Sequence, residues 1–239
     1  ILTRLVGSEM CIRDRIRSIS EFTEKQVLNF GYQGLFVRFP AWINIDNYLN
    51  ADIKRSYSDT FKIIFVGSVT ERKNPKIIIE SLETIDGNVS LEIIGQTPNL
   101  KYLKELNNLI SSSKHAESIT MTPFIKAEEL ISKYSSANLF ILPSKSEGLG
   151  RVIIEAQSTA CPVLVSSNTG MVDLIIENET GYIFENNNKN DLSNKIQHIM
   201  NNYESALQTG LNSKDFVKEN QSVANFEFGY KKLIDLVST

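Results

Sequence analysis

Short apolar runs alternate with amphipathic runs over most of this chain, from Phe61 onward. The apolar runs contain few polar residues, which is typical of strands buried on both faces of a parallel sheet. The intervening runs place apolar residues at helical spacing, and this alternation predicts an α/β fold whose parallel strands are joined by right-handed crossovers, with helices on both faces. We expect strands at 61–67, 89–95, 118–124, 139–144, 162–166 and 182–184, and helices at 75–86, 99–113, 127–136, 150–159, 171–178 and 189–201.

Composition limits the class of protein. The 239 residues are 41% hydrophobic and 22% charged, as in ordinary globular proteins. A net charge of −3 gives no basic field for nucleic acid. No apolar run approaches the roughly 20 residues that span a bilayer. The two cysteines, Cys11 and Cys161, are too few for a disulfide framework or a metal site, which fits a cytoplasmic protein.

The two ends differ from the regular middle. Residues 1–15 have no clear period and resemble translated read-through of a sequencing adaptor, so we interpret them as a non-native leader and exclude them from fold reasoning. A native polar N-terminus is the alternative. Residues 16–50 contain a helical segment and then an extended one, 51–203 form the regular domain, and 204–239 have helical spacing.

One loop and helix, at 145–159, combine two features of a ligand site. Gly148 and Gly150 allow close approach of the backbone, and the helix that follows offers free amides and a positive dipole end to a phosphate. Glu147 precedes this helix, and Glu155 lies inside it, where an ionised carboxylate can accept hydrogen bonds from both hydroxyls of a ribose. Alone, such a pair of glutamates is more often a solvated helix face.

Two further segments follow other strands at the same sheet edge, where ligands of such sheets bind. Arg72 and Lys73 come after the first strong strand, and two cations there can neutralise a diphosphate. Thr169 and Gly170 precede a predicted helix and offer another group of amides. The alternatives are a solvated basic turn and a simple capped turn.

In this order and spacing, the three segments resemble the nucleotide-sugar-binding half of retaining glycosyltransferases of the GT-B fold, in the family called glycosyl transferases group 1. That family has a strand ending in glycine, a lysine-containing turn, the pattern Glu-Gly-x-Gly-x-x-x-x-Glu-Ala and a Pro-Val strand. Here these read FVGSVTERKNP, EGLGRVIIEA and CPVLVS. The combination is more specific than a lone glycine-rich motif. The resemblance covers residues 16–239 and implies a Rossmann-like sheet, the C-terminal half of a GT-B fold.

The resemblance implies a role for each matching residue. Glu147 would contact hydroxyls of the donor sugar, Glu155 the ribose, and Lys73 the diphosphate. Arg72 would supply a second charge, because Ser68 stands where the family usually has arginine. Loop amides and glycines would complete the donor site, at Gly67, Ser68, Gly148, Leu149, Gly150, Arg151, Thr169 and Gly170.

The implied reaction is transfer of a hexose from a nucleotide-diphosphate sugar to an acceptor hydroxyl, with retention, in bacterial surface polysaccharide or glycolipid synthesis. No cofactor is implied, and the lack of an Asp-x-Asp motif predicts no essential metal. Segments 16–50 and 204–239 would be a remnant of, and helices crossing back to, a missing N-terminal acceptor-binding domain. The chain would then be an inactive fragment of a cytoplasmic enzyme that can associate peripherally with the inner face of the membrane.

Two other functions stay open. A nucleotide-sugar epimerase or another GT-B enzyme would share the donor site, although no motif for a phosphorylase cofactor lysine is present. A non-catalytic nucleotide-sugar-binding module would keep the fold without the chemistry. The missing arginine at Ser68 favours that module, whereas intact Glu147, Glu155 and Lys73 argue against it.

Overall fold

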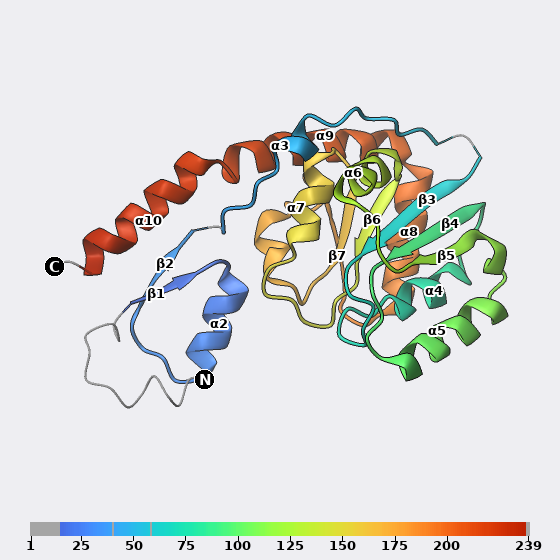
Figure 1. The fold of residues 1–239 in the computed structure, drawn as a ribbon, viewed down its shortest axis with the longest axis horizontal. Helices are drawn as coiled ribbons and strands as arrows, with labels where there is room; N and C mark the ends of the chain where they lie inside the picture. The colour runs from blue at the N-terminus through green and yellow to red at the C-terminus, as the bar shows by residue number, and fades with distance from the viewer. Residues whose placement is uncertain (1–14, 40, 58, 238–239) are drawn as a thin grey trace. The chain divides into compact units, whose positions relative to one another are not determined.

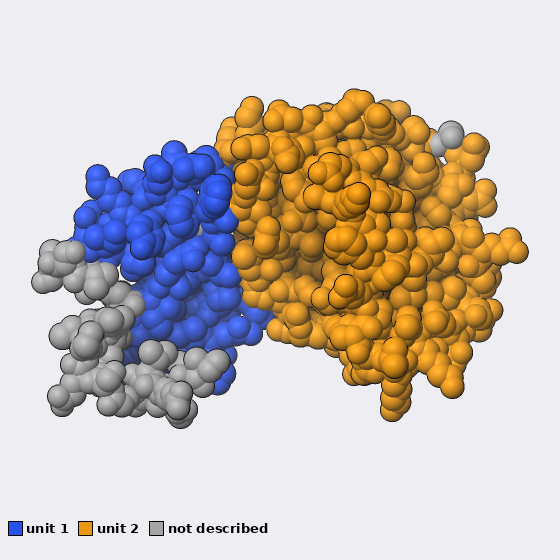
Figure 2. All heavy atoms as spheres, in the orientation of Figure 1, with its two compact units in different colours: residues 1–42, 220–239 blue, residues 43–219 orange. Residues whose placement is uncertain are grey.

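A computed structural model of the chain describes residues 15–39, 41–57 and 59–237 (Figure 1). The chain divides into two compact units, one of residues 1–42 and 220–239 and one of residues 43–219 (Figure 2). The larger unit contains every segment that the sequence singled out for ligand binding. The predicted boundaries at 50 and 203 therefore differ from the division into units, which falls at 42 and 219.

The larger unit is built on one parallel sheet of six strands, in the order β5-β4-β3-β6-β7-β8. Each apolar run became a strand near its predicted position, which confirms the predicted α/β fold. Strands β6 and β7 are buried along their whole length, as continuous apolar runs require. The strands are β3 (Phe61–Val66), β4 (Val89–Ile94), β5 (Ile119–Thr122), β6 (Leu139–Leu142), β7 (Val163–Ser166) and β8 (Tyr182–Phe184).

Helices form two packed groups beside this sheet. On one side α4 packs with α5 and α8, and on the other α7 packs with α6 and the short α3. Asparagine side chains cap two of the longer helices, since Asn99 accepts from two amides at the start of α5 and Asn188 does so for α8. The helices are α3 (Asp46–Leu49), α4 (Lys76–Leu82), α5 (Leu100–Ser112), α6 (Ala127–Ser136), α7 (Arg151–Ser158), α8 (Lys189–Asn201) and α9 (Tyr203–Asn220).

The strand order reverses between β3 and β6. The chain runs outward from β3 to β4 and β5, then returns to β6 on the other side of β3 and continues to β7 and β8. Loops that follow β3 and β6 therefore lead to helices on opposite faces of the sheet. Parallel sheets bind their ligands in the crevice that opens at such a switch point.

One predicted helix, at 171–178, is wrong. The chain forms only a short 3₁₀ helix there, η3 (Gly170–Leu174), because Ile175 is already extended and Asn178 has a φ of +65°. The Thr180 hydroxyl accepts a hydrogen bond from the Ile176 amide at 2.8 Å, which takes an amide that a longer helix would use. A second 3₁₀ helix, η2 (Ala116–Ser118), leads into β5.

The smaller unit joins the two ends of the described chain. Strand β1 (Arg15–Ser18) pairs in parallel with β2 (Leu35–Arg38), and α2 (Glu21–Asn29) connects them. Helix α10 (Val223–Val237) contacts β2. The rings of Phe39 and Phe226 meet edge to face at 5.8 Å, and the Arg17 guanidinium lies 4.5 Å from the Phe39 ring centroid. Strand β1 was not predicted, since it begins at Arg15, within the segment 1–15 that was interpreted as a leader; residues 1–14 of that segment lie outside the described residues.

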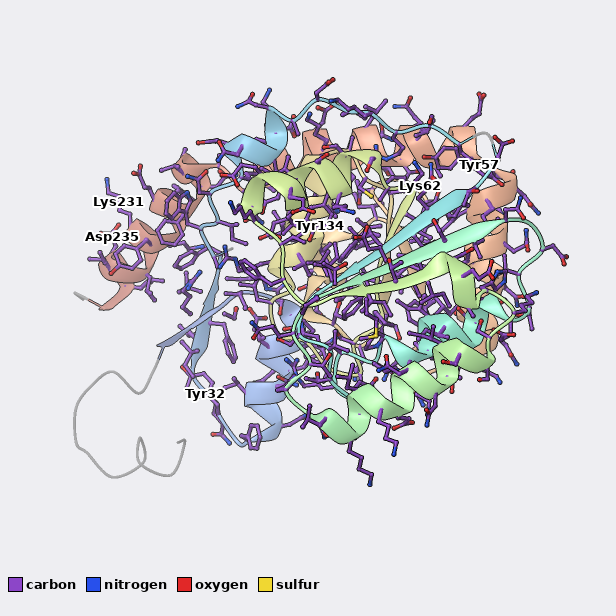
Figure 3. The ribbon with its side chains drawn as sticks, turned by 45° about the vertical axis from the view of Figure 1, so that its right-hand side comes forward. Tyr32, Tyr57, Lys62, Tyr134, Lys231 and Asp235 are labelled. Carbon is purple, nitrogen blue, oxygen red and sulfur yellow. The ribbon has the colours of Figure 1, made fainter. Side chains whose placement is uncertain are left out.

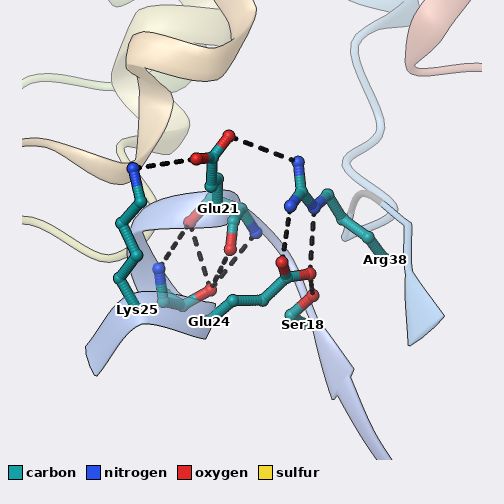
Figure 4. A network of polar contacts seen from close by, with 7 residues as sticks. Ser18, Glu21, Glu24, Lys25 and Arg38 are labelled. Carbon is teal, nitrogen blue, oxygen red and sulfur yellow. Dashed lines mark hydrogen bonds and ion pairs between the residues drawn. The ribbon is translucent and has the colours of Figure 1, made fainter. Parts of the chain in front are cut away.

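A polar network connects the elements of this smaller unit (Figure 4). Arg38 at the end of β2 donates from Nε to Glu24 of α2 at 2.9 Å, and Ser18 of β1 donates to the same carboxylate. These bonds lower the pKa of the Glu24 carboxyl. The network thus ties β1, β2 and α2 together.

No helix of the described residues is long and apolar enough to cross a membrane.

Candidate functional site

The loops after β3 and β6, at the switch point, are bonded to each other. The Lys145 amide donates to the Arg72 carbonyl at 2.8 Å, and Arg72 Nη1 donates to the Ser146 carbonyl at the same distance. The two loops that carry the predicted cations and the predicted glutamate are therefore one structural piece. The sequence separates them by more than 70 residues, and only the strand order brings them together.

Three charged side chains meet where these loops join. Lys73 Nζ contacts Glu147 Oε2, and Arg72 Nη1 lies 3.3 Å from the same oxygen. The side chains of Lys73 and Glu147 are only 13% and 10% exposed, whereas that of Arg72 is 57% exposed. We call Arg72, Lys73 and Glu147 the charge triad. It carries two positive charges and one negative charge, so its net charge of about +1 suits an anion.

The loop after β7 completes this edge. The Gly170 amide donates to the Glu147 carbonyl at 2.7 Å, and Asn168 Nδ2 donates to the Lys145 carbonyl at 2.5 Å. The predicted amide at Gly170 is thus already bonded to protein. The Thr169 hydroxyl is buried and finds no hydrogen-bond partner within the described part of the chain. These contacts fix the main chain on both sides of Glu147.

The turn after β3, at Gly67, passes very close to the backbone of Gly95. Gly67, which directly follows β3, donates its amide to the Ile94 carbonyl at 2.9 Å. A Cβ atom at Gly95 would lie 1.9 Å from the Gly67 carbonyl oxygen, and Gly95 has a φ of +148°. Only glycine can occupy that position without moving the Gly67 turn. Ser68, just beyond the turn, is exposed.

Helix α7 carries Glu155, the second predicted carboxylate, one turn after Arg151. Gly150 precedes the helix, and no side-chain hydrogen bond caps its start within the described residues. Burial raises the pKa of the Glu155 carboxyl, while the charge of Arg151 and a hydrogen bond from Tyr134 lower it again. The Tyr134 hydroxyl lies 3.4 Å from Glu155 Oε2.

The structure brings some predicted residues together and leaves others apart. Arg72, Lys73 and Glu147 form one cluster, and Thr169 and Gly170 lie beside it through the paired backbone of Glu147 and Thr169. Leu149 packs against the hydrophobic core, so only its backbone can serve a ligand. Gly148 is half-buried, Gly150 is buried and Arg151 is exposed. In the part of the chain that the structure describes, no hydrogen bond or ion pair joins Glu155 to the charge triad.

Three residues that support this site were missed by sequence reasoning. Tyr134 contacts Glu155, Asn168 joins two loops, and Arg55 bonds to backbone carbonyls at the ends of α6 and α7. Asn168 directly precedes the predicted site residues Thr169 and Gly170, but nothing in the sequence indicates that its side chain joins two loops. Tyr134 and Arg55 act through contacts between segments far apart in sequence, which no spacing in a single sequence reveals.

A cavity of about 530 Å³ opens at the carboxyl ends of β4 and β5. Gly95, the residue packed against the Gly67 turn, is part of its wall, so the cavity borders the loop that leads to the charge triad. The wall also contains Gln96, Thr97, Pro98, Leu103, Asn107, Met121 and Pro123. Among the described residues, no group of three or more His, Cys, Asp or Glu side chains could hold a metal ion.

Residues 49–216 match the family model of glycosyl transferases group 1. The chain is 31% identical over 179 residues to an uncharacterised glycosyltransferase of Methanocaldococcus jannaschii, covering 74% of this chain and 49% of that protein. It is 30% identical over 182 residues to the capsular polysaccharide biosynthesis glycosyltransferase CapM of Staphylococcus aureus, covering 73% of this chain and 46% of that protein. The chain thus spans about half the length of these relatives.

Solved structures share the fold at lower identity. A glycosyltransferase from Rickettsia africae superposes with a TM-score of 0.83 at 19% identity, over 99% of this chain and 66% of that chain. Anabaena HepE in complex with UDP-glucose gives a TM-score of 0.81 at 15% identity, over 93% of this chain and 64% of that chain. The family model covers more than half of the 239 residues. The chain belongs to the glycosyl transferases group 1 family.

Proposed function

We propose that this chain binds the donor of a glycosyltransferase that moves a hexose from a nucleotide-diphosphate sugar to an acceptor hydroxyl with retention. The observation that carries the proposal is the charge triad at the switch point, where Lys73, Arg72 and Glu147 meet. Family membership and the UDP-glucose complex of Anabaena HepE support a nucleotide-sugar donor. CapM supports a role in surface polysaccharide synthesis.

The contacts within the charge triad suggest how the donor would bind, by replacing Glu147 as the partner of the two cations. Without ligand, both cations contact the same carboxylate oxygen of Glu147, which compensates only one of the two positive charges. A diphosphate would compete for Lys73 and Arg72, and the released Glu147 carboxylate could then accept hydrogen bonds from sugar hydroxyls. As the glycosidic bond to the diphosphate breaks, negative charge grows on the leaving oxygens, where these cations and the amides at the start of α7 stabilise it.

The cavity beside the Gly67 turn provides room for the base of the nucleotide. Its volume of about 530 Å³ falls within the range of small-molecule pockets. Glu155 would bind the ribose between base and diphosphate, as an ionised carboxylate accepts from two hydroxyls. The amides around Gly148, Leu149, Gly150 and Arg151, with those of Ser68 and Thr169, would line the remaining donor path. The reaction as proposed uses no metal and no cofactor.

A calorimetric and thermal-shift screen of this chain against UDP, GDP, ADP and their sugars tests the proposal. We expect one diphosphate to bind and to raise the melting temperature by mass action. The proposal also expects weak binding and little or no sugar transfer by this chain alone, because it spans about half of the relatives it matches. Robust transfer by the purified chain would contradict that part. Binding of none of the diphosphates would contradict the donor site.

Glu155→Gln is expected to weaken nucleotide binding without weakening the fold. Burial raises the pKa of Glu155 in the folded chain, so the protonated form favours folding and this contribution is lost as pH rises through that pKa. The neutral amide removes the cost of ionising a buried group. At pH 7 we therefore expect an unchanged or higher melting temperature and an affinity about ten- to a hundredfold lower.

Melting temperatures between pH 5 and 8 and titration calorimetry with UDP and GDP would check this result. Glu179→Gln is the matched control, because Glu179 is exposed. The stability difference between the Glu155 variant and the unaltered chain should widen as pH rises, and the control should show no such trend. A lower melting temperature of Glu155→Gln together with full nucleotide affinity would contradict both predictions.

The other two functions separate by product. A nucleotide-sugar epimerase would convert or hydrolyse the donor without an acceptor, so donor alone, incubated with the longer protein, distinguishes it from a transferase. A binding module would bind the nucleotide sugar and release it unchanged. The buried contact between Lys73 and Glu147 supports a donor site, which all three functions would share.

A further inference from the structure

We propose that Tyr134 is a positioning residue for Glu155: its hydroxyl binds one carboxylate oxygen and leaves the other for the ribose of the donor. The inference rests on the proposed function, because it assigns a partner to the carboxylate that would bind the ribose. It starts from a group that the mechanism does not otherwise use. Tyr134 is fully buried in the interior of the larger unit (Figure 3), yet its hydroxyl faces an ionisable side chain.

The contact between Tyr134 and Glu155 joins two helices. Tyr134 lies on α6 and its hydroxyl is 3.4 Å from Glu155 Oε2 on α7. That separation is long for a hydroxyl and a carboxylate, and such bonds in ligand-free sites often shorten when the ligand arrives. Among the described residues, the Glu155 carboxylate has no other hydrogen bond. The proposal assigns its other oxygen, Oε1, to a ribose hydroxyl of the donor.

The tyrosine ring cannot rotate away from the carboxylate. It packs edge to face on Phe140 of β6 at 5.7 Å, and the Tyr48 ring of α3 lies 6.2 Å away on a tilt. Close packing of this kind restricts a side chain to one rotamer. The Tyr134 hydroxyl is thus held at a fixed place relative to the sheet, and Glu155 receives its orientation from it.

Arg55 ties the C-terminal ends of the two helices together. Its guanidinium donates to four carbonyls, of Tyr134 (2.9 Å), Ala137, Thr159 (3.3 Å) and Ala160 (2.8 Å). The first pair ends α6 and the second pair ends α7, where carbonyls lack partners within the helix. A planar group with several fixed donors suits this arrangement better than a flexible ammonium would. Tyr134 and Glu155 lie in the last turns of α6 and α7, so this anchor holds the two helices at the place where the two side chains meet.

The charges around Glu155 agree with this geometry. Arg151 faces it from α7, Tyr134 from α6 and Tyr48 from α3. Burial and the negative charge of Glu155 raise the pKa of Tyr134 well above its usual range and that of Tyr48 to about 12. Both phenols stay protonated in the working pH range, so Tyr134 acts as a donor to an ionised carboxylate.

Tyr134→Phe tests the proposal, because it removes one oxygen and keeps the packed ring. We expect an affinity for UDP or GDP about fivefold lower, and no change in affinity for inorganic pyrophosphate, which lacks a ribose. In an NMR titration of ¹³C-labelled glutamate, the pKa of Glu155 should rise, since the bond that favours its charged form is gone. Tyr182→Phe is the control, as Tyr182 is buried and its hydroxyl lies 3.3 Å from neutral Thr209.

A double variant separates positioning from general structure. If Tyr134 acts through Glu155, adding Tyr134→Phe to Glu155→Gln should cause no further loss of nucleotide affinity. Full additivity of the two losses, or an unchanged pKa of Glu155, would overturn the proposal. If Glu155→Gln retains full affinity, the donor-site assignment fails and the Tyr134 proposal fails with it. If Glu155→Gln loses affinity while Tyr134→Phe does not, the Tyr134 proposal alone fails.

Discussion

Lys73→Met is expected to lower the stability of the ligand-free chain by about 3 kcal/mol and to reduce nucleoside-diphosphate affinity about a hundredfold. Lys73 is largely buried against Glu147, whose carboxylate is 10% exposed. Among the described residues, the one ion-pair partner left to this carboxylate without Lys73 is Arg72, at 3.3 Å and with an exposed side chain. Removing one partner of a buried ion pair leaves an uncompensated charge, which costs more than the pair itself contributes.

Urea unfolding and titration calorimetry would measure the two effects of Lys73→Met. Arg72→Met is the matched control, since it removes the same charge from the same carboxylate but at a side chain 57% exposed. We expect that control to cost less than about 1 kcal/mol. Adding Glu147→Gln to Lys73→Met should restore most of the stability and none of the affinity. Equal losses of stability in Lys73→Met and Arg72→Met would show that burial of the Lys73–Glu147 pair does not affect the stability of the chain.

The strands were predictable from sequence because their burial leaves a direct pattern. Apolar runs such as 139–142 and 163–166 are buried completely, and short continuous apolar runs are typical of strands buried on both faces of a parallel sheet. The places of the site loops followed from the same pattern, since strand ends share one edge of the sheet. The helix predicted at 171–178 was wrong because its apolar spacing suits a helix, while the backbone is already extended at Ile175.

The partners within the site were not predictable. The sequence placed Lys73, Arg72 and Glu147 at one sheet edge and assigned each to a ligand, but it gave no sign that they bind one another. Which charges cancel depends on loop geometry within a few ångströms. The contacts of Tyr134 and Arg55 depend in turn on how α6 and α7 pack on the sheet, and helical periodicity fixes only the buried face.

Gly95→Ala is expected to destabilise the chain by more than about 3 kcal/mol. Two costs combine at this position. Its φ of +148° is a conformation that residues with a Cβ rarely adopt, and the new Cβ would lie 1.9 Å from the Gly67 carbonyl oxygen. That oxygen belongs to backbone, so relief requires the turn after β3 to move. The turn leads to Arg72 and Lys73, and nucleotide affinity should fall even where the variant is still folded.

Gly87→Ala separates these two costs, because Gly87 also has a positive φ, of +105°, but its nearest neighbour would be the flexible end of Met200 at 3.5 Å. Backbone strain alone predicts a loss of about 1 to 2 kcal/mol there. The difference between the two variants in urea unfolding measures the close approach of Gly95 to Gly67. Far-UV circular dichroism and the soluble yield give the same ranking if Gly95→Ala is too unstable to titrate. Equal losses would mean that the Gly67 turn tolerates displacement, and that the cations of the charge triad are not positioned by it.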